Sequence, residues 1–367
     1  MIMSVFSMMK SKEWSDFYNS SISHEYITDR YLFLTKSENT NIYMNHCSFS
    51  GLKSRAIYIS NADGPLVLAE SSCFIGCSSA DEGQGGSIFF TGDSIVFSEC
   101  CFVESNLYGT NKEGVLAFLS CKNDGNALNY FIYSVVYGNG LETQNSLSQI
   151  HQLHGLPYHE KMNITQNVCD SYSIFKIEGS GDCWINNSLI VGNNDTVAGI
   201  MLRQPTEFYR VKLESNENHN NEGNTALILS LSQILIFQYV IFYDSSHSTG
   251  IYCSNCNFGL LNSEVHSNII GDSNSAFEYG SSRYYIDGFV KFNNIQVQDM
   301  VNNYVQISLD FTLHDNNICF YLDPSSNPNI PTQNTTTPKQ FPTEKRDKYN
   351  LKRNLVFYVP SLGYYCN

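Results

Sequence analysis

Three histidines stand close together in the sequence, at His151, His154 and His159. Imidazole nitrogens bind zinc when the ligands are held on a rigid scaffold. These three fall within 140–161, which we interpret, like 107–114, as a long polar insertion that loops out on the variable side. The pattern therefore favours a polar surface loop, and a zinc site is the less favoured interpretation.

Cysteine is the other residue type that points to metal or redox chemistry. The chain has twelve cysteines, and three pairs are close in sequence: Cys73 with Cys77, Cys100 with Cys101, and Cys253 with Cys256. A structural zinc site needs two pairs of matched spacing, and only 253–256 has the Cys-x-x-Cys form. We therefore favour buried thiols that pack as small apolar side chains, with some disulfides as the first alternative and a metal as the second.

Composition restricts the class of protein and of partner. Of the 367 residues, 42% are hydrophobic and only 15% are charged, so the chain has ample apolar surface to bury. An aromatic content of 13% favours strands. The net charge of −14 makes nucleic acid and anionic membrane surfaces poor partners, because both are bound through clustered Lys and Arg.

The sequence carries little signal for membrane insertion or secretion. The longest apolar stretch, 234–243, is far shorter than the roughly 20 residues that span a bilayer, so we expect no transmembrane helix. Residues 1–9 are apolar but lack a basic start and a small-residue cleavage site. They are therefore a weak candidate for a signal peptide.

An internal repeat is the strongest feature of the sequence. Apolar residues recur about 27 residues apart on average, each between a short strand-like run and a polar turn. From Val136 onward, the third position after this anchor is Asn five times and Asp once. The anchors are Phe49, Phe74, Phe102, Val136, Ile164, Ile190, Leu213, Ile241 and Val265.

This period, with short strands and no helical periodicity, predicts an all-β, single-stranded parallel β-solenoid. About ten coils fit between residues 27 and 322. Coils stacked at the strand spacing of about 4.8 Å place equivalent residues above one another, so we expect columns of inward Phe, Ile and Cys. We also expect an amide ladder of corner asparagines, each tolerating a left-handed backbone.

Four segments follow from this pattern. Residues 1–26 are an N-terminal cap, whose amphipathic stretch 12–17 we expect over the open edge of the first coil. Residues 27–322 are the β-helix. Residues 323–348 are a disordered linker rich in Pro, Thr and Asn, and 349–367 are an apolar C-terminal segment.

The motif Gly-Gly-Ser-Ile-Phe at 85–89, with the Cys-Phe and apolar-x-x-Asn units, resembles the GGA-I/L and FxxN repeats of Chlamydia-type polymorphic membrane proteins. It resembles still more closely the β-helix proteins of trichomonad parasites. The resemblance covers about 27–322 and implies a right-handed parallel β-helix. It also implies, for many members, a surface location with adhesive or antigenic roles, although the membrane anchor common in such relatives does not occur here.

The β-helix also carries pectate lyases and polygalacturonases, so catalysis must be weighed on the residues. The Asn-Thr-Asp, Asp-Asp, Gly-His-Gly and Arg-Ile-Lys motifs of galacturonan hydrolases do not occur, nor does a phosphate loop or a nucleophile triad. Asp81 and Glu82 fit a solvated turn. A lyase needs clustered acids and a base, whereas the basic residues of the repeat are scattered, at Arg203, Arg210, Lys212, Arg283 and Lys291.

We therefore assign no catalytic, cofactor-binding or metal-binding residue from the sequence, and lean against an enzyme. The leading hypothesis is a β-solenoid of binding or adhesion type that presents an exposed face to a protein or glycan partner. The alternatives are a polysaccharide-active lyase or hydrolase on the same fold, and an intracellular repeat scaffold. The resemblance implies an extracellular or cell-surface location, and a cytoplasmic one is the alternative.

Overall fold

The structure of the protein is a computed structural model. The predicted linker 323–348 and the C-terminal segment 349–367 lie outside the residues that it describes. These are 13–26, 32–34, 41–60, 64–79, 84–108, 113–140, 146–218, 226–232, 234–243, 247, 249–253, 257–261, 263–265, 277–279, 283–287 and 291–292.

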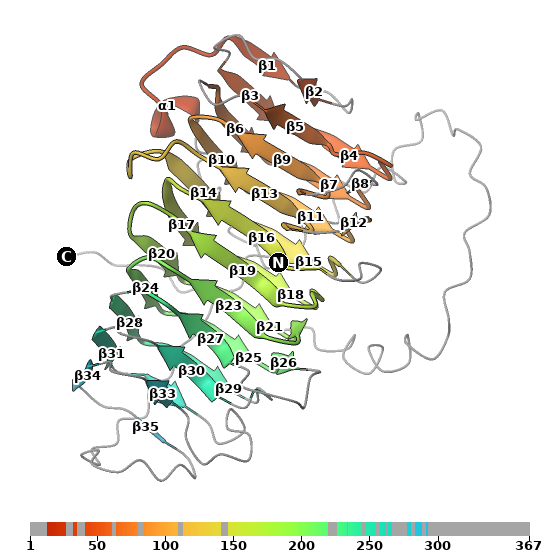
Figure 1. Ribbon diagram of the computed structural model, residues 1–367. Coiled ribbons are helices and arrows are strands. Elements are labelled where there is room, and N and C mark those ends of the chain that lie inside the picture. Colours follow the sequence, from red (N-terminus) through yellow and green to blue (C-terminus); the bar gives the residue numbers. More distant parts are fainter. Residues whose placement is uncertain are drawn as a thin grey trace, which may run out of the picture.

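The described chain winds into a parallel β-solenoid with three long sheets, which we call A, B and C (Figure 1). In each coil the chain passes from sheet A to sheet C and then to sheet B, and every described strand pair in these sheets is parallel. The all-β solenoid that the sequence predicts is therefore confirmed. It arises because one coil cannot bury its inward side chains until a second coil is stacked on it.

Eleven described strands form sheet A, and ten form each of the other two. Sheet A contains β1 (His24–Tyr26), β3 (Ile42–Asn45), β6 (Leu66–Glu70), β10 (Ser94–Ser98), β14 (Leu128–Ile132), β17 (Leu156–Glu160), β20 (Cys183–Asn186), β24 (Thr206–Tyr209), β28 (Ile234–Gln238), β31 (Asn257–Leu261) and β34 (Arg283–Asp287). Sheet C contains β4 (Ser48–Ser50), β7 (Cys73–Ile75), β11 (Cys101–Val103), β15 (Val135–Tyr137), β18 (Asn163–Thr165), β21 (Leu189–Val191), β25 (Lys212–Glu214), β29 (Ile241–Tyr243), β32 (Glu264–Val265) and β35 (Lys291–Phe292).

Sheet B contains β2 (Leu32–Leu34), β5 (Ile57–Ser60), β9 (Ile88–Thr91), β13 (Ala117–Ser120), β16 (Ser148–Leu153), β19 (Tyr172–Glu178), β23 (Ala198–Leu202), β27 (Ala226–Ser230), β30 (Thr249–Cys253) and β33 (Phe277–Tyr279). Between sheets C and B, some coils add a two-residue strand to a small pair. These pairs are β8 (Ser78–Ser79) with β12 (Asn106–Leu107), and β22 (Asn194–Asp195) with β26 (Glu217–Asn218).

The anchor column of sheet C confirms the repeat register at every predicted position but one. Seven predicted anchors pair in register, each with the next along the column: Phe49, Phe74, Phe102, Val136, Ile164, Ile190 and Leu213. The prediction of Ile241 is wrong, because Leu213 pairs with Phe242, which in turn pairs with Val265. Ile241, Phe242 and Tyr243 are all apolar, so their alternation does not reveal which one points inward.

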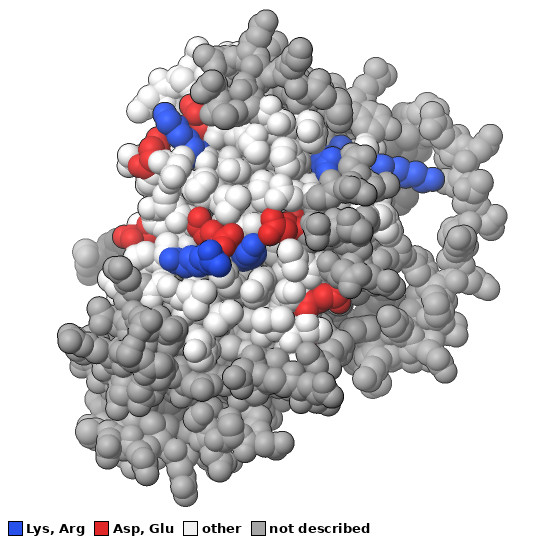
Figure 2. All heavy atoms as spheres, in the orientation of Figure 1, with Lys and Arg blue, Asp and Glu red and all other residues white. Residues whose placement is uncertain are grey.

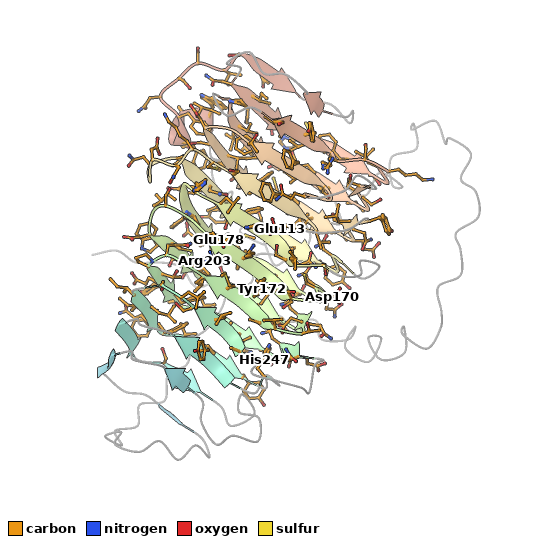
Figure 3. The ribbon with its side chains drawn as sticks, viewed as in Figure 1. Glu113, Asp170, Tyr172, Glu178, Arg203 and His247 are labelled. Atoms are coloured by element: carbon orange, nitrogen blue, oxygen red, sulfur yellow. The ribbon has the colours of Figure 1, made fainter. Side chains whose placement is uncertain are left out.

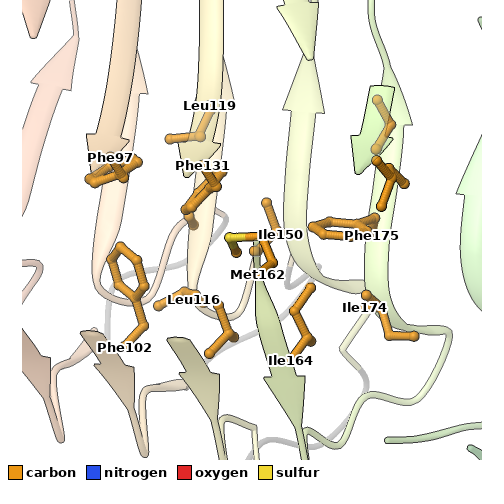
Figure 4. Close-up of a cluster of buried hydrophobic side chains, with 14 of the residues drawn as sticks. Phe97, Phe102, Leu116, Leu119, Phe131, Ile150, Met162, Ile164, Ile174 and Phe175 are labelled. Atoms are coloured by element: carbon orange, nitrogen blue, oxygen red, sulfur yellow. The ribbon is translucent and has the colours of Figure 1, made fainter. Parts of the chain in front are cut away.

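The core is a continuous stack of apolar side chains contributed by all three sheets (Figure 4). Phe74 stacks between Phe49 and Phe102, with ring centroids 5.1 and 5.0 Å away, close to the strand spacing. Phe97 and Phe131 of sheet A stack at 4.9 Å. Equivalent residues in successive coils therefore pack directly on one another.

The corner asparagines form the predicted ladder. Asn139, Asn167, Asn193 and Asn216 are fully buried and succeed one another coil by coil. The side-chain amide of each of the first three donates to Oδ1 of the next asparagine at 2.9–3.0 Å. That oxygen also accepts the main-chain N–H of the preceding asparagine at 3.0–3.2 Å. The ladder thus pairs side-chain and main-chain polar groups at a corner that is closed to water.

The prediction that these asparagines adopt the left-handed conformation is wrong. The residue before each of them adopts it instead, at Gly138, Gln166, Gly192 and Ser215, with φ between 50° and 64°. The turn is thus made one residue earlier, and the asparagine side chain points into the coil. The corner between sheets A and C also uses one left-handed residue per coil: His46, Ser71, Glu99, Tyr133, Lys161, Asn187, Arg210 and Tyr239.

The Gly-Gly motif marks the entry into sheet B, where the backbone passes very close to the next coil. A Cβ on Gly86 would lie 2.0 Å from the carbonyl oxygen of Val115. Gly85 has φ +72°, and a Cβ there would lie 2.1 Å from the carbonyl oxygen of Ile88. Glycine is therefore required at both positions.

The predicted insertion at 140–161 is wrong. It contains β16 and β17, which pair in register with β13 and β14 and complete an ordinary coil. The error arose because the strand sequence Ser-Gln-Ile-His-Gln-Leu of β16 is too polar to be read as an apolar run. Of the other predicted insertion, 107–114, residues 109–112 lie outside the described residues, and Glu113 bridges back to Gln84.

The helix α1 (Trp14–Phe17) packs on the outer face of sheet A. The Tyr18 hydroxyl donates to the main-chain oxygen of Val67 at 2.8 Å. Trp14 and Tyr18 pack with Leu68, Val96 and Ile132, which lie on three successive strands. These contacts lie on the flank of the sheet, whereas the sequence pattern suggested a cover over the open end. Within the described ranges, no helix has the length and apolar character needed to cross a membrane.

We predict that Asn167→Ala lowers the free energy of unfolding by about 3 kcal/mol, because it leaves buried polar groups of Asn139 and Asn193 without their partners. Urea-induced unfolding of the variant and of the wild type measures the loss. Asn19→Ala, at an exposed asparagine, is the matched control. Equal stabilities of the two variants would contradict a structural role for the ladder.

Candidate functional site

Charged side chains gather at one place on the outer face of sheet B. Glu113 precedes β13, His151 lies on β16, Lys176 and Glu178 lie on β19, and Arg203 follows β23. We call these five residues the charged cluster. Figure 2 shows the acidic and basic members as one band of red and blue atoms across a face that is otherwise mostly uncharged, and Figure 3 shows Glu113, Glu178 and Arg203 side by side.

The cluster is closed by mutual contacts. Lys176 Nζ lies 2.9 Å from Glu113 Oε1 and 3.4 Å from Glu178 Oε2. The buried His151 ring lies between the two carboxylates, with Nδ1 3.3 Å from Glu113 Oε2 and Nε2 2.9 Å from Glu178 Oε2. Arg203 Nε lies 3.1 Å from Glu178 Oε1. Each charge in the cluster thus has an opposite charge within contact distance.

Both carboxyl groups of the cluster have a lowered pKa. For Glu113 the contact with His151 is the largest cause. Hydrogen bonds from Lys176 and Gln84 lower the pKa further, and together these contacts outweigh burial, which would raise it. For Glu178 burial alone would raise the pKa, but the contact with His151 and the charges of Lys176 and Arg203 outweigh it. A catalytic general acid needs a raised pKa, so these contacts favour an ion-pair network over acid catalysis.

An aromatic column precedes the cluster on the same face. Tyr58, Phe89 and Phe118 occupy equivalent positions of β5, β9 and β13, and His151 continues the column. Their rings stack nearly parallel, with centroids 5.1 and 5.5 Å apart and interplanar angles of 19° and 12°. Each ring therefore presents much of its face to its neighbours, which leaves little ring face for a ligand.

The outer face of sheet A carries a different arrangement. Tyr130, Tyr158 and Trp184 occupy equivalent positions of β14, β17 and β20 and are each half-buried. We call them the aromatic shelf. The rings of Tyr130 and Tyr158 are 5.1 Å apart but tilted by 47°, so neither covers the face of the other completely.

Polar groups border the shelf. The Tyr158 hydroxyl donates to Glu160 Oε2 at 3.1 Å, and Asn186 lies beside Glu160 in register. Burial is the largest cause that raises the pKa of Tyr130 and of Tyr158, so both hydroxyls keep their protons at neutral pH. The shelf thus combines aromatic surface with hydroxyl, amide and carboxylate groups.

A second polar cluster is fully buried near the C-terminal end of the described solenoid. His247 Nε2 lies 3.1–3.2 Å from both carboxylate oxygens of Asp195. Ser173 and Asn218 donate to the same carboxylate at 3.1 and 2.9 Å. The Ser173 hydroxyl bonds to the aspartate rather than to the histidine, so the three do not form a nucleophile triad.

The three histidines singled out in the sequence do not converge. His151 faces outward in the charged cluster, His154 forms the turn between β16 and β17 with φ 60°, and His159 points into the core. His159 packs between Phe131 and Phe175 and contacts Gln152 Oε1 through Nε2 at 2.9 Å. Among the described residues, no group of three or more His, Cys, Asp and Glu is placed to hold a metal ion.

The other charged residues and the cysteines singled out in the sequence lie at separate places in the fold. Arg203 joins the charged cluster, whereas Lys212 pairs with Glu214 on sheet C at 2.7 Å. Asp81, Glu82 and Cys256 lie outside the described residues, as do the side chains of Arg283 and Lys291. Among the described residues, Cys101 is disulfide-bonded, Cys47 is buried, and six further cysteines are free and buried, namely Cys73, Cys77, Cys100, Cys121, Cys169 and Cys183. Burial raises the pKa of Cys73, Cys77 and Cys169 to about 12, so these thiols are inert small packing groups.

Comparison of the chain with protein-family models, with curated proteins and with solved structures finds no match. The resemblance to trichomonad and Chlamydia-type repeats is therefore supported only at the level of the parallel β-solenoid.

Sequence reasoning missed both outward-facing sites. The shelf residues lie one repeat apart, so the anchor register extended to outward positions would have found them. The charged cluster carries no such signal, because Glu113 and Arg203 lie outside the strands and at different positions of their coils.

We predict that His159 makes the solenoid sensitive to acid. Burial lowers its pKa to about 3, below the ordinary 6.5, so between these values the unfolded chain binds a proton that the folded chain does not. This contribution to stability is complete above pH 6.5 and is lost as the pH falls towards 3. In His159→Phe, the slope of unfolding free energy against pH should decrease by up to about 1.4 kcal/mol per pH unit.

Urea unfolding between pH 7 and pH 4 measures this slope. The variant also leaves Gln152 Oε1 without its partner, so the slope is the readout rather than the stability at a single pH. His154→Asn, which keeps a residue that tolerates the left-handed turn, is the matched control. A slope in His159→Phe equal to that of the control would show that His159 does not carry the effect.

Proposed function

We propose that the protein is a non-enzymatic binding protein of adhesion type, and that it holds a carbohydrate on the aromatic shelf of sheet A. The observation that carries the proposal is the column of Tyr130, Tyr158 and Trp184 on the outer face of the sheet, with Glu160 and Asn186 at its border.

The chemistry of the shelf matches that of a sugar ring. A pyranose has an apolar C–H face that packs on an aromatic ring, and a rim of hydroxyl groups that need donors and acceptors. Tyr158, Glu160 and Asn186 supply such groups beside the rings. The tilted rings of the shelf leave more face uncovered than the parallel stack on sheet B does.

The size of the shelf also favours a glycan over a folded protein. Three successive strands at about 4.8 Å spacing separate Tyr130 from Trp184 by only about 10 Å. A stable protein–protein interface buries about 800 Å² on each partner, which is several times what three half-buried rings offer. A chain of a few sugar rings fits this dimension.

We predict that Trp184→Ala weakens glycan binding at least tenfold, because truncation of an aromatic anchor commonly costs about 2 kcal/mol or more. Calorimetric titration with cello-, chito-, xylo- and malto-oligosaccharides measures the affinity. Tyr58→Ala, which removes an aromatic ring from the outer face of sheet B, is the matched control and should bind like the wild type. Failure of every oligosaccharide to bind the wild type would overturn the proposal.

A polysaccharide lyase or hydrolase is the second candidate, and the convergence of Glu113, Glu178 and Lys176 is the observation that favours it. The lowered pKa of both carboxyl groups stands against the hydrolase, because a hydrolase needs one carboxyl group that stays protonated as the general acid. We expect no release of reducing ends or unsaturated sugars from pectin, xylan or glucan by the wild type. If the wild type releases these sugars and Glu178→Gln does not, the protein is a catalyst and the proposed binding function is wrong.

A further inference from the structure

We infer, resting on the proposed function, that the ligand is an extended, β-linked and uncharged glycan that lies along the solenoid axis with three sugar rings on the shelf. Direction, linkage, length and charge each follow from a separate feature of the shelf and its surroundings.

The direction follows from the register. Tyr130, Tyr158 and Trp184 are direct partners on adjacent strands, so the line that joins them crosses the strands and runs along the axis. The ring centroids of Tyr130 and Tyr158 are 5.1 Å apart, close to the strand spacing. A ligand that contacts all three rings must therefore advance by about one strand spacing per unit.

The linkage follows from this straight and regular step. In a β-1,4-linked chain of glucose-type sugars the rings follow one another in a nearly straight ribbon, each with an apolar face to pack on an aromatic ring. An α-1,4-linked chain curves away, so its second and third rings leave a straight row of side chains. The shelf therefore selects the extended, β-linked class.

The length follows from what closes the shelf at each end. On the N-terminal side, Trp14 and Tyr18 of the α1 region pack with Leu68, Val96 and Ile132, in the same cluster that Tyr130 and Tyr158 border. On the C-terminal side, the position in register with Trp184 is Glu207, which offers no aromatic face. Three coils, and hence three sugar rings, remain between these limits.

The charge class follows from the side chains beside the rings. Glu160 borders the shelf and Glu207 ends it, so uronic acids and sulfated sugars would meet like charge. The neighbouring cation Lys161 is held by Tyr133, with Nζ 3.0 Å from the hydroxyl oxygen and 4.5 Å from the ring centroid. An uncharged glycan avoids both carboxylates.

Calorimetric titration of the full chain with cello-oligosaccharides of one to six units tests the inference. Affinity should rise at least about tenfold from glucose to cellotriose and then change less than about twofold up to cellohexaose. Malto-oligosaccharides and oligogalacturonates should bind at least about tenfold more weakly than cellotriose. Comparable affinity for the α-linked or the acidic series would overturn the inference while leaving carbohydrate binding intact.

Glu207→Tyr is a second variant that adds an aromatic ring in register with Trp184 at a half-buried surface position. The affinity of this variant should continue to rise to the tetrasaccharide, by at least about threefold over the trisaccharide. A plateau that stays at three units in a folded Glu207→Tyr would contradict the placement of the chain along the column. Absence of binding to any saccharide by the wild type would instead overturn the proposed function itself.

Discussion

The constraint on which this structure depends is the register between successive coils. Because the coils pair through parallel ladders, any residue placed inward in one coil must fit the equivalent residue in the next. The asparagine ladder holds this register at one corner, since each amide bonds both the side chain and the main chain of its neighbour. A slip by one residue would break these bonds and turn the phenylalanine columns outward.

The same constraint explains how much of the fold could be predicted. Inward positions repeat in chemical type, so the anchors from Phe49 to Leu213 and the asparagines from Asn139 to Asn216 were visible in the sequence. The exception at Ile241 occurs where three successive residues are apolar and the period of two cannot be seen. The left-handed residue at each corner varies in type, from Gly192 to Gln166, so the position of the turn carried no clear pattern.

The coil that contains β16 shows where sequence reasoning fails and why. Its inward Gln152 bonds to Asn129 and contacts His159, so polar side chains replace apolar ones inside the tube. The hydrogen bonds of Gln152 stabilise this buried network, yet in sequence it has the composition of a loop. Tertiary pairing with β13 and β19, rather than local propensity, makes this segment a strand.

Outward side chains need not match the equivalent side chains of the next coil, and for this reason the outer faces of sheets A and B differ. On sheet B, the parallel rings and the closed ion pairs satisfy one another, so that face is complete without a ligand. On sheet A, α1 covers the first coils with its own aromatic residues. Tyr130 and Tyr158 lie at the border of this cluster, and Trp184 continues the row on the next strand. Along the axis, this outer face thus changes from a part that α1 covers to a part where aromatic rings lie beside the polar side chains of Glu160 and Asn186. The face whose rings are tilted rather than stacked in parallel is therefore the one on which we seek binding.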